Sequence, residues 1–496
     1  MAQTTNGTSN GKANAAFDSS STVPLFLDGK QVTTSSSFDV ISPIDNKTCW
    51  KCSSADEEDV KKAIASSEKA FKTWSKSKPS TRRDIFIKAA QLLKQKEEEA
   101  LIYSSTETGA AESMFKFEFA LAVEGCLTLG GLIQSVQGSV PTVGAEGSSA
   151  MMLREPYGVC LGIAPWNAPH VLGMRACLAP IAMGNTVILK GPEASPATYW
   201  NFVNILHEAG LPAGVLNTIY HKPQDAAQVT NALITNPAIK KVNFTGSTNV
   251  GSIIASLCGK NLKPCLMELG GKAPSIVCAD ADLDNAALQC ALGSFLHAGQ
   301  ICMSTERIIV ESTIAEEFKK KLSATMDQVF SKDQPAPVLV NAPPVKKNKE
   351  LLKDALSKGA RAIYGDVDAE ESSNTRMRPV IIDNINKEMT IYHTESFGPT
   401  VSLYVLPSDE SFEEKALELA NDTDYGLASA VFTEDLRKGL RLAKGIETGA
   451  VHINSMSVHD EAGLPHGGAK KSGFGRFNMR EGLEEWVRTK IISWKD

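Results

Sequence analysis

The residue best suited to covalent chemistry is Cys302, in the segment Gly299-Gln300-Ile301-Cys302-Met303-Ser304. We expect this cysteine on a loop between a predicted helix at 284–296 and a predicted strand at 307–310, and loops held by such elements commonly carry reactive groups. A thiolate is a strong nucleophile, but most buried cysteines are inert, and the chain has ten cysteines. Taken alone, Cys302 is therefore a minority candidate for a nucleophile.

Two further motifs could serve such a nucleophile. Glu268 ends an apolar strand in Met267-Glu268-Leu269-Gly270-Gly271-Lys272, so it is either a general base in apolar surroundings or a solvated strand-end carboxylate. The turn Phe244-Thr245-Gly246-Ser247 follows a strand and opens a helix, the layout that aims backbone N–H groups at a phosphate. It lacks the Gly-x-Gly-x-x-Gly spacing, so by itself it is a weak phosphate signal.

The motifs that resemble metal sites are incomplete. Cys49-Trp50-Lys51-Cys52 has the spacing of half a zinc or redox site, but no second Cys or His pair completes it. Asp280-Ala281-Asp282-Leu283-Asp284 resembles the opening of a calcium loop, but Asn285 and Ala291 stand where Gly and Glu are needed. We expect these acids to cap the next helix, and the sequence predicts no metal site.

Alternating strands and helices must position the reactive groups. Short β-rich runs alternate with helical stretches between 150 and 278, and a second alternation runs from the helix at 284–296 to a strand at 401–405. Such alternation predicts parallel sheets with helices on both faces. We therefore expect an α/β fold with two parallel-sheet domains, preceded by amphipathic helices between 56 and 105.

Length and composition exclude several classes of protein. The 496 residues exceed the roughly 250–300 that one core supports, and the net charge of -6 argues against a nucleic-acid partner. Arg175 and the run 166–170 interrupt the apolar stretch Val159–Met183, so we expect no membrane span. The polar residues 1–24 predict a disordered leader without the apolar core of a signal peptide. Average cysteine usage favours a reduced, cytoplasmic location.

Six motifs together resemble the aldehyde dehydrogenase superfamily in order and spacing, from about Leu25 to the C-terminus. They are Pro165-Trp166-Asn167, Lys190 with Glu193, Phe244-Thr245-Gly246-Ser247, Glu268-Leu269-Gly270-Gly271-Lys272, Gly299-Gln300-Ile301-Cys302 and Glu395-Ser396-Phe397-Gly398-Pro399. The resemblance implies a Rossmann-like NAD-binding domain (25–137 and 156–267), a catalytic domain (268–450) and a small β oligomerisation flap (138–155 and 480–496). It also implies a homodimer or homotetramer.

The resemblance also assigns chemical roles. Cys302 attacks the aldehyde, and the Asn167 amide stabilises the resulting oxyanion. Hydride transfer to NAD converts the thiohemiacetal to a thioester, and Glu268 activates the water that releases a free carboxylic acid. Glu193 favours NAD over NADP because its carboxylate repels a 2′-phosphate. The cofactor-binding residues implied are Trp166, Lys190, Glu193, Gly246, Ser247, Leu269, Glu395 and Phe397.

Substrate class is predicted from Ala168, Arg175, Ile301 and Met303. Ala168, where Phe is common in the family, widens the tunnel for a ring, and Arg175 is expected either to meet an anion or ortho oxygen of the substrate or to pair with an acid at the protein surface. The strings 302–307 and 458–461 look like the salicylaldehyde and vanillin dehydrogenase branch. A succinate-semialdehyde-type enzyme and an idle structural protein are the alternatives. His466 departs from the family pattern, in which Phe is usual at this position.

Overall fold

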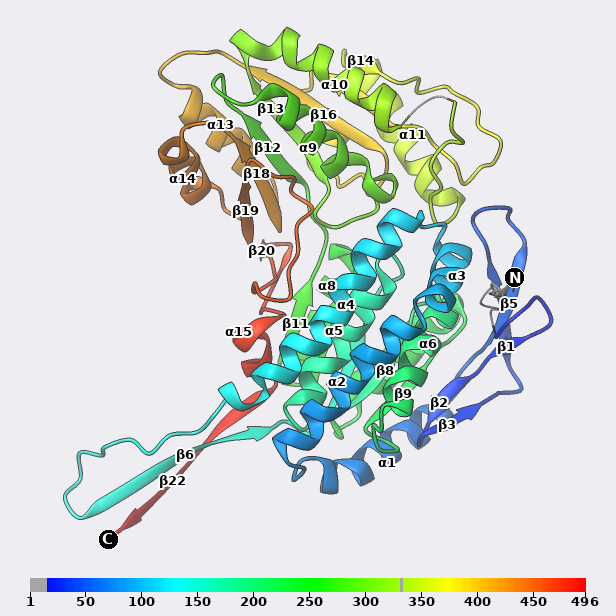
Figure 1. Ribbon diagram of the computed structural model, residues 1–496, viewed down its shortest axis with the longest axis vertical. Coiled ribbons are helices and arrows are strands. Elements are labelled where there is room, and N and C mark those ends of the chain that lie inside the picture. Colours follow the sequence, from blue (N-terminus) through cyan, green and yellow to red (C-terminus); the bar gives the residue numbers. More distant parts are fainter. Residues whose placement is uncertain (1–15, 331–332) are drawn as a thin grey trace, which may run out of the picture.

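The structure is a computed structural model that describes residues 16–330 and 333–496 (Figure 1). Residues 1–15 of the predicted leader therefore lie outside the described residues. The expectation of disorder is wrong for the rest of the leader. The ring of Phe17 packs edge-on against Trp200 with centroids 4.7 Å apart, and β1 (Thr22–Val23) pairs with β5 (Thr48–Ser53).

An eight-stranded sheet forms the first of two α/β layers. Five parallel strands make its centre, in the order β11 (Cys265–Glu268), β10 (Ile239–Thr245), β7 (Val159–Ile163), β8 (Thr186–Lys190) and β9 (Leu216–Ile219). Antiparallel strands close its edges: β21 (Gly473–Phe474) beside β11, then β2 (Leu25–Leu27) and β3 (Lys30–Val32) beside β9. The strands at the centre are almost wholly buried, as expected when helices cover both faces.

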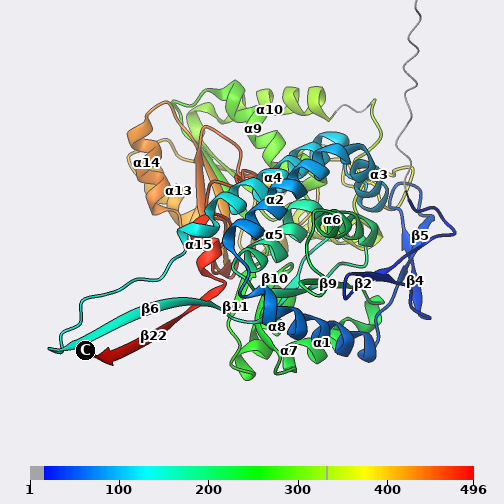
Figure 2. The same ribbon diagram turned by 60° about the horizontal axis from the view of Figure 1, so that its bottom comes forward.

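Helices lie on both faces of this sheet (Figure 2). One face carries α1 (Glu57–Trp74), α7 (Ala226–Thr235) and α8 (Thr248–Lys260). The other carries α5 (Pro169–Ala182) and α6 (Pro196–Glu208), with α2 (Pro79–Gln95), α3 (Glu97–Thr108) and α4 (Glu112–Leu132) packed outside them.

A seven-stranded sheet forms the second layer. Its order is β14 (Arg361–Tyr364), β15 (Val380–Asp383), β16 (Thr400–Leu406), β13 (Thr305–Glu311), β12 (Ala273–Val277), β18 (Ala428–Phe432) and β19 (Ala450–Ile453), parallel except for the edge strand β14. One face packs on α9 (Leu283–Phe295) and α10 (Ala315–Val329), the other on α13 (Phe412–Asn421) and α14 (Leu436–Gly445). The predicted α/β fold with two parallel sheets is confirmed.

Shorter elements complete the two layers. They are α11 (Ala342–Ser357), α12 (Thr390–His393), a small sheet of β1, β5 and β4 (Ser37–Ile41), and the pair β17 (Tyr425–Gly426) with β20 (Ala469–Lys470). After β19, the last strand of the second sheet, the chain returns to the first sheet and adds β21 to its edge. The first sheet is therefore built from two separate segments of the chain.

A two-stranded ribbon projects from the body of the molecule (Figures 1 and 2). β6 (Ser148–Pro156) and β22 (Val487–Lys495) pair antiparallel, from Val487 opposite Pro156 to Lys495 opposite Ser148. The helix α15 (Met479–Glu484) and the fully buried Trp486 belong to the body, so the ribbon begins after the predicted start at residue 480. Ile491 and Trp494 on the ribbon are exposed.

The apolar stretch Val159–Met183 forms β7 and α5, not a span. Within the described residues, one helical segment, Glu112–Ser135, is long and apolar enough to cross a membrane. The core helix of a globular protein passes the same test, and here the segment packs on α2 and α5 and carries the buried Glu118.

Candidate active site

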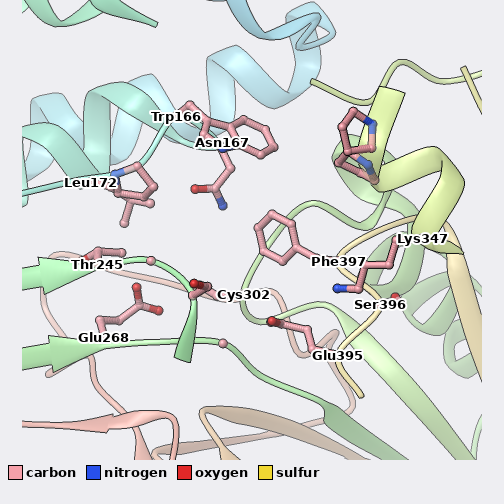
Figure 3. Close-up of a pocket in the computed structure, with 16 residues that line it drawn as sticks. Trp166, Asn167, Leu172, Thr245, Glu268, Cys302, Lys347, Glu395, Ser396 and Phe397 are labelled. Atoms are coloured by element: carbon pink, nitrogen blue, oxygen red, sulfur yellow. The ribbon is translucent and has the colours of Figure 1, made fainter. Parts of the chain in front are cut away.

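A cavity of about 460 Å³ lies where the carboxyl ends of β10 and β11 face the loop before β13 and the segment 395–397 (Figure 3). In open α/β sheets, ligands bind beyond the carboxyl ends of the strands. Eight of the predicted site residues line it: Trp166, Asn167, Gly246, Ser247, Glu268, Cys302, Glu395 and Phe397.

The Cys302 loop is held by its backbone geometry and by Gln300. His297, Ala298 and Gly299 adopt left-handed backbone conformations in succession at the end of α9. The side chain of Gln300 then ties the loop to the neighbouring chain, since its Oε1 accepts from the N–H of Val340 at 2.9 Å. These contacts fix the thiol of Cys302 at the cavity wall.

Asn167 is positioned by the start of α5. The buried carboxylate of Glu118 accepts from the N–H groups of His170 and Val171, at 3.0 and 3.1 Å, and contacts His170 Nδ1 at 2.9 Å. It thus satisfies two backbone donors that a helix N-terminus leaves free. Asn167 Nδ2 donates to the carbonyl of Gln300 at 2.9 Å, and because an amide nitrogen carries two hydrogens, one remains for the cavity.

Glu268 ends β11, opposite Thr245 on β10 and Gly473 on β21. Its side chain is buried, and Oε1 has no hydrogen-bond partner. Figure 3 shows its carboxylate directed towards Cys302. Burial and the carboxylates of Glu268 and Glu395 raise the pKa of the Cys302 thiol well above its ordinary value. The resting thiol is therefore protonated at neutral pH, with an acceptor for its proton beside it.

The double glycine after Glu268 allows two close approaches. A Cβ at Gly270 would lie 2.5 Å from Glu395 Oε2, and one at Gly271 would lie 2.2 Å from the carbonyl oxygen of Cys302. The N–H of Gly271 donates to Glu395 Oε1 at 2.8 Å, while burial raises the pKa of Glu395 to about 7. Any larger side chain would displace the Cys302 loop or Glu395.

A second cavity, of about 790 Å³, lies between α7 and α8 and includes Lys190 in its wall. Burial lowers the pKa of Lys190 to about 8, and Glu193 stands exposed close by in sequence. Gly246 and Ser247 line the first cavity at the start of α8, and the Ser247 hydroxyl accepts from the N–H of Val250. A helix N-terminus between a lysine-lined cavity and the Cys302 cavity suits a dinucleotide with its pyrophosphate at α8.

The remaining predicted residues lie outside the two cavity walls. Ala168, Leu269, Ile301 and Met303 are all buried. Leu269 instead packs against α8, where a Cβ at Gly251 would lie 2.3 Å from it. Ile301 and Met303 flank Cys302 in sequence.

Arg175 does not present a free charge to substrate. It is buried beside a cavity of about 30 Å³, and its Nη2 pairs with Asp460. Burial alone would raise the pKa of Asp460, but Arg175 and His466 lower it to about 2. The expectation that Arg175 meets an anion or ortho oxygen of the substrate is therefore corrected to an ion pair within the fold, because Asp460 already neutralises the guanidinium. The alternative expectation, pairing with an acid, holds, although the pair is buried.

Several lining residues were missed from the sequence. They are Pro165, Leu172, Thr245, Gly270, Pro343, Pro344, Lys347 and Ser396. Pro165, Thr245, Gly270 and Ser396 lie inside the six motifs of the sequence, so their position next to predicted site residues could have revealed them. Lys347 comes from α11, where an amphipathic pattern gives no signal for a site.

The metal-like motifs have structural roles. The Asp282 side chain accepts from the N–H groups of Asp284 and Asn285 and caps α9, as predicted. Cys49 and Cys52 are free thiols. Across residues 16–330 and 333–496, no group of three or more His, Cys, Asp or Glu side chains could hold a metal ion.

Comparison with known proteins agrees with the fold and the site. Residues 31–492 match the model of the aldehyde dehydrogenase family. The chain is 41% identical to a vanillin dehydrogenase of Pseudomonas sp. (strain HR199 / DSM 7063) over 95% of this chain and 97% of that protein. It is 39% identical to a salicylaldehyde dehydrogenase of Pseudomonas sp. (strain C18), again over 95% and 97%.

A solved structure is similar along its whole length. The salicylaldehyde dehydrogenase of Pseudomonas putida G7, complexed with salicylaldehyde, superposes with a TM-score of 0.91 at 35% identity, covering 96% of this chain and 98% of that one. The chain therefore belongs to the aldehyde dehydrogenase family, whose members are oxidoreductases acting on small-molecule aldehydes with NAD or NADP.

Proposed function

We propose that this protein oxidises a hydroxylated aromatic aldehyde to the free carboxylic acid with NAD. One observation carries the proposal: Cys302, Asn167 and Glu268, which are far apart in sequence, line one cavity. The similarity to vanillin and salicylaldehyde dehydrogenases supports an aromatic aldehyde. An idle structural protein would have no need to keep a nucleophile, an amide donor and a buried carboxylate together.

The first half of the reaction forms a thioester on Cys302. The thiol gives its proton to the neighbouring Glu268 carboxylate as sulfur bonds to the aldehyde carbon, and the carbonyl oxygen becomes an anion. Glu268 releases that proton to solvent before hydrolysis begins. The free N–H of the Asn167 amide and the backbone N–H of Cys302 stabilise that charge, each contributing about 3–4 kcal/mol in well-formed oxyanion holes. NAD supplies the acceptor for the hydride that leaves the thiohemiacetal carbon.

The second half releases the acid. Glu268 takes a proton from water, the water oxygen bonds to the thioester carbon, and the carbon–sulfur bond breaks to regenerate the Cys302 thiolate. A buried carboxylate without a hydrogen-bond donor on Oε1 is free to take that proton. The presence of Glu268 supports water, not coenzyme A, as the acyl acceptor.

We infer that NAD is preferred to NADP. Lys190 and Glu193 would hold the adenine-side ribose, and the exposed Glu193 carboxylate would repel a 2′-phosphate. Gly246 and Ser247 would hold the pyrophosphate at the N-terminus of α8, with Glu395 and Phe397 on the nicotinamide side. The ring of Phe397 stands perpendicular to that of Trp166, with the ring centroids 6.1 Å apart, and both residues line the cavity.

The exposed strand β22 and its apolar Ile491 and Trp494 support assembly into a homodimer or homotetramer through the ribbon. A cytoplasmic location is the expectation that suits ten free thiols.

A panel of aldehydes tests the proposal. The purified protein with NAD should give the highest kcat/KM on salicylaldehyde or vanillin, a lower value on benzaldehyde, and the lowest on succinate semialdehyde. Cys302→Ser should abolish NADH formation and retain NAD binding. If the wild type oxidises none of these aldehydes, or prefers the semialdehyde, the proposal is wrong.

A further inference from the structure

A buried histidine stands between two buried carboxylates beside the active site. His466 Nε2 lies 3.7 Å from Glu268 Oε1, and its Nδ1 lies 3.9 Å from Asp460 Oδ1. All three side chains are at least nine-tenths buried. His466 Nε2 and Glu268 Oε1, the two atoms that face each other, both lack a hydrogen-bond partner.

The backbone of His466 is fixed. It forms an isolated antiparallel bridge with Phe477, with N–H to carbonyl distances of 2.9 and 2.7 Å. The side chain therefore moves only by rotation about its own bonds, and a small rotation closes 3.7 Å to a hydrogen bond as soon as Glu268 carries a proton. No water fits between two atoms so close. Hydrogen bonds in catalytic sites are often long without substrate and shorten when it binds.

Asp460 anchors the far side of the imidazole. Its carboxylate pairs with Arg175 through Oδ2 and accepts from Asn478 Nδ2 at 3.2 Å through Oδ1. It remains ionised, as its low pKa requires. An ionised carboxylate at Nδ1 favours the tautomer with the proton on Nδ1 and the lone pair on Nε2, facing Glu268, and it stabilises the imidazolium once formed.

We propose that His466 is a positioning residue for the general base Glu268. Its Nε2 accepts a hydrogen bond from the Glu268 carboxyl group once that group has taken a proton from water, and it then receives that proton during thioester hydrolysis. This inference rests on the proposed function. Water loses a proton to Glu268 as its oxygen bonds to the thioester carbon, and the carbon–sulfur bond breaks to leave the thiolate of Cys302. The proton then passes from Glu268 to Nε2 of His466, so Glu268 is ionised while the acid leaves. It returns through Glu268 to the Cys302 thiolate, which restores the thiol and the neutral imidazole for the next turnover.

The charges around His466 suit this transfer. Glu268 and Asp460 flank it, and Arg175 lies behind Asp460. With His466 protonated, the two carboxylates and two cations sum to zero, so the imidazolium is not left as an uncompensated buried charge. A phenylalanine in this place would fill the space without accepting a proton.

Single-turnover and steady-state kinetics test the inference. In His466→Phe, we expect a burst of about one NADH per active site with a rate constant within twofold of wild type, followed by a steady-state rate at least tenfold below it. His466→Gln, which can orient Glu268 but not hold its proton, should show the same burst and slow turnover. His459→Phe is the matched control, because His459 lies in the same loop but pairs with Glu461 at 2.8 Å, and it should turn over like wild type.

Chemical rescue separates a proton acceptor from a structural role. In His466→Gly, added imidazole should restore steady-state turnover severalfold without changing the burst. The inference is overturned if His466→Phe turns over at the wild-type rate, if burst and steady state fall together, or if imidazole rescues nothing. An absence of NADH formation by the wild type with every aldehyde would refute the proposed function instead.

Discussion

Replacing Asn167 by Ala tests the oxyanion hole most directly. The change removes the amide that donates to the Gln300 carbonyl at 2.9 Å and the second N–H that faces the cavity. Loss of one preorganised oxyanion donor costs about 2.7–4 kcal/mol, so kcat should fall by about 10²–10³. The substrate KM should change little, because the charge that the amide meets develops only during the reaction.

The same substitution also affects stability. Asn167 is 5% exposed, and its removal leaves the carbonyl of Gln300 without a donor in the interior. A buried polar group left unpaired costs about 1–3 kcal/mol, which urea unfolding measures. Native proteins are typically stable by about 5–15 kcal/mol, so most of the variant should remain folded and can be assayed.

Asn243 provides a matched control. It is fully buried, and its Nδ2 donates to the carbonyl of Ala176 at 3.0 Å, but it does not line the Cys302 cavity. Asn243→Ala should lose about as much stability as Asn167→Ala and keep kcat within a few-fold of wild type. NADH absorbance at saturating aldehyde and NAD measures kcat for the two variants. An Asn167→Ala protein within threefold of wild type, or equal losses of activity in the two variants, would refute the oxyanion-hole assignment.

Three further predictions concern charge. Arg175→Leu should destabilise the fold by about 3–5 kcal/mol, because it leaves Asp460 as an uncompensated buried charge, and urea unfolding measures this loss. The same variant should change the KM for anionic and for neutral aldehydes equally, which steady-state assays with both kinds of aldehyde check. Because burial and Glu268 raise the pKa of Cys302, the thiolate fraction without cofactor should still grow with pH through 9, so the rate of iodoacetamide inactivation should rise without a plateau; a plateau near neutral pH would contradict the raised pKa. Glu193→Ala should raise KM for NAD and lower KM for NADP, and an unchanged ratio in steady-state assays would show that Glu193 does not select the cofactor.

Local patterns accounted for most of the fold. The predicted helix at 284–296 is α9 (Leu283–Phe295), and the predicted strand at 307–310 lies within β13 (Thr305–Glu311). Periodicity is a local property, so alternating runs reveal parallel α/β layers without knowledge of their contacts. Segments near the N-terminus, whose order depends on contacts with distant residues, were less predictable. Residues 16–24 are polar in composition, yet Phe17 and β1 are ordered by contacts with Trp200 and β5.

The six motifs predicted the reactive groups but not their ionic partners. Arg175 and Asp460 are 285 positions apart, and no periodicity links them. The sequence shows an arginine near a tunnel and leaves open whether it meets a substrate or an acid. Only the packing of α5 against the segment before β20 brings in the acid. His466 is visible in the sequence as a departure, but its distance to Glu268 is not.

The sequence by itself determined the α/β class, and its six motifs taken together predicted Cys302 as the nucleophile, Asn167 as the amide donor and Glu268 as the base. The tertiary structure alone decided which charges are already paired, which walls enclose the thiol, and that an imidazole faces the base. Such contacts join segments hundreds of residues apart, and a buried charge is set by whatever side chain reaches it in space.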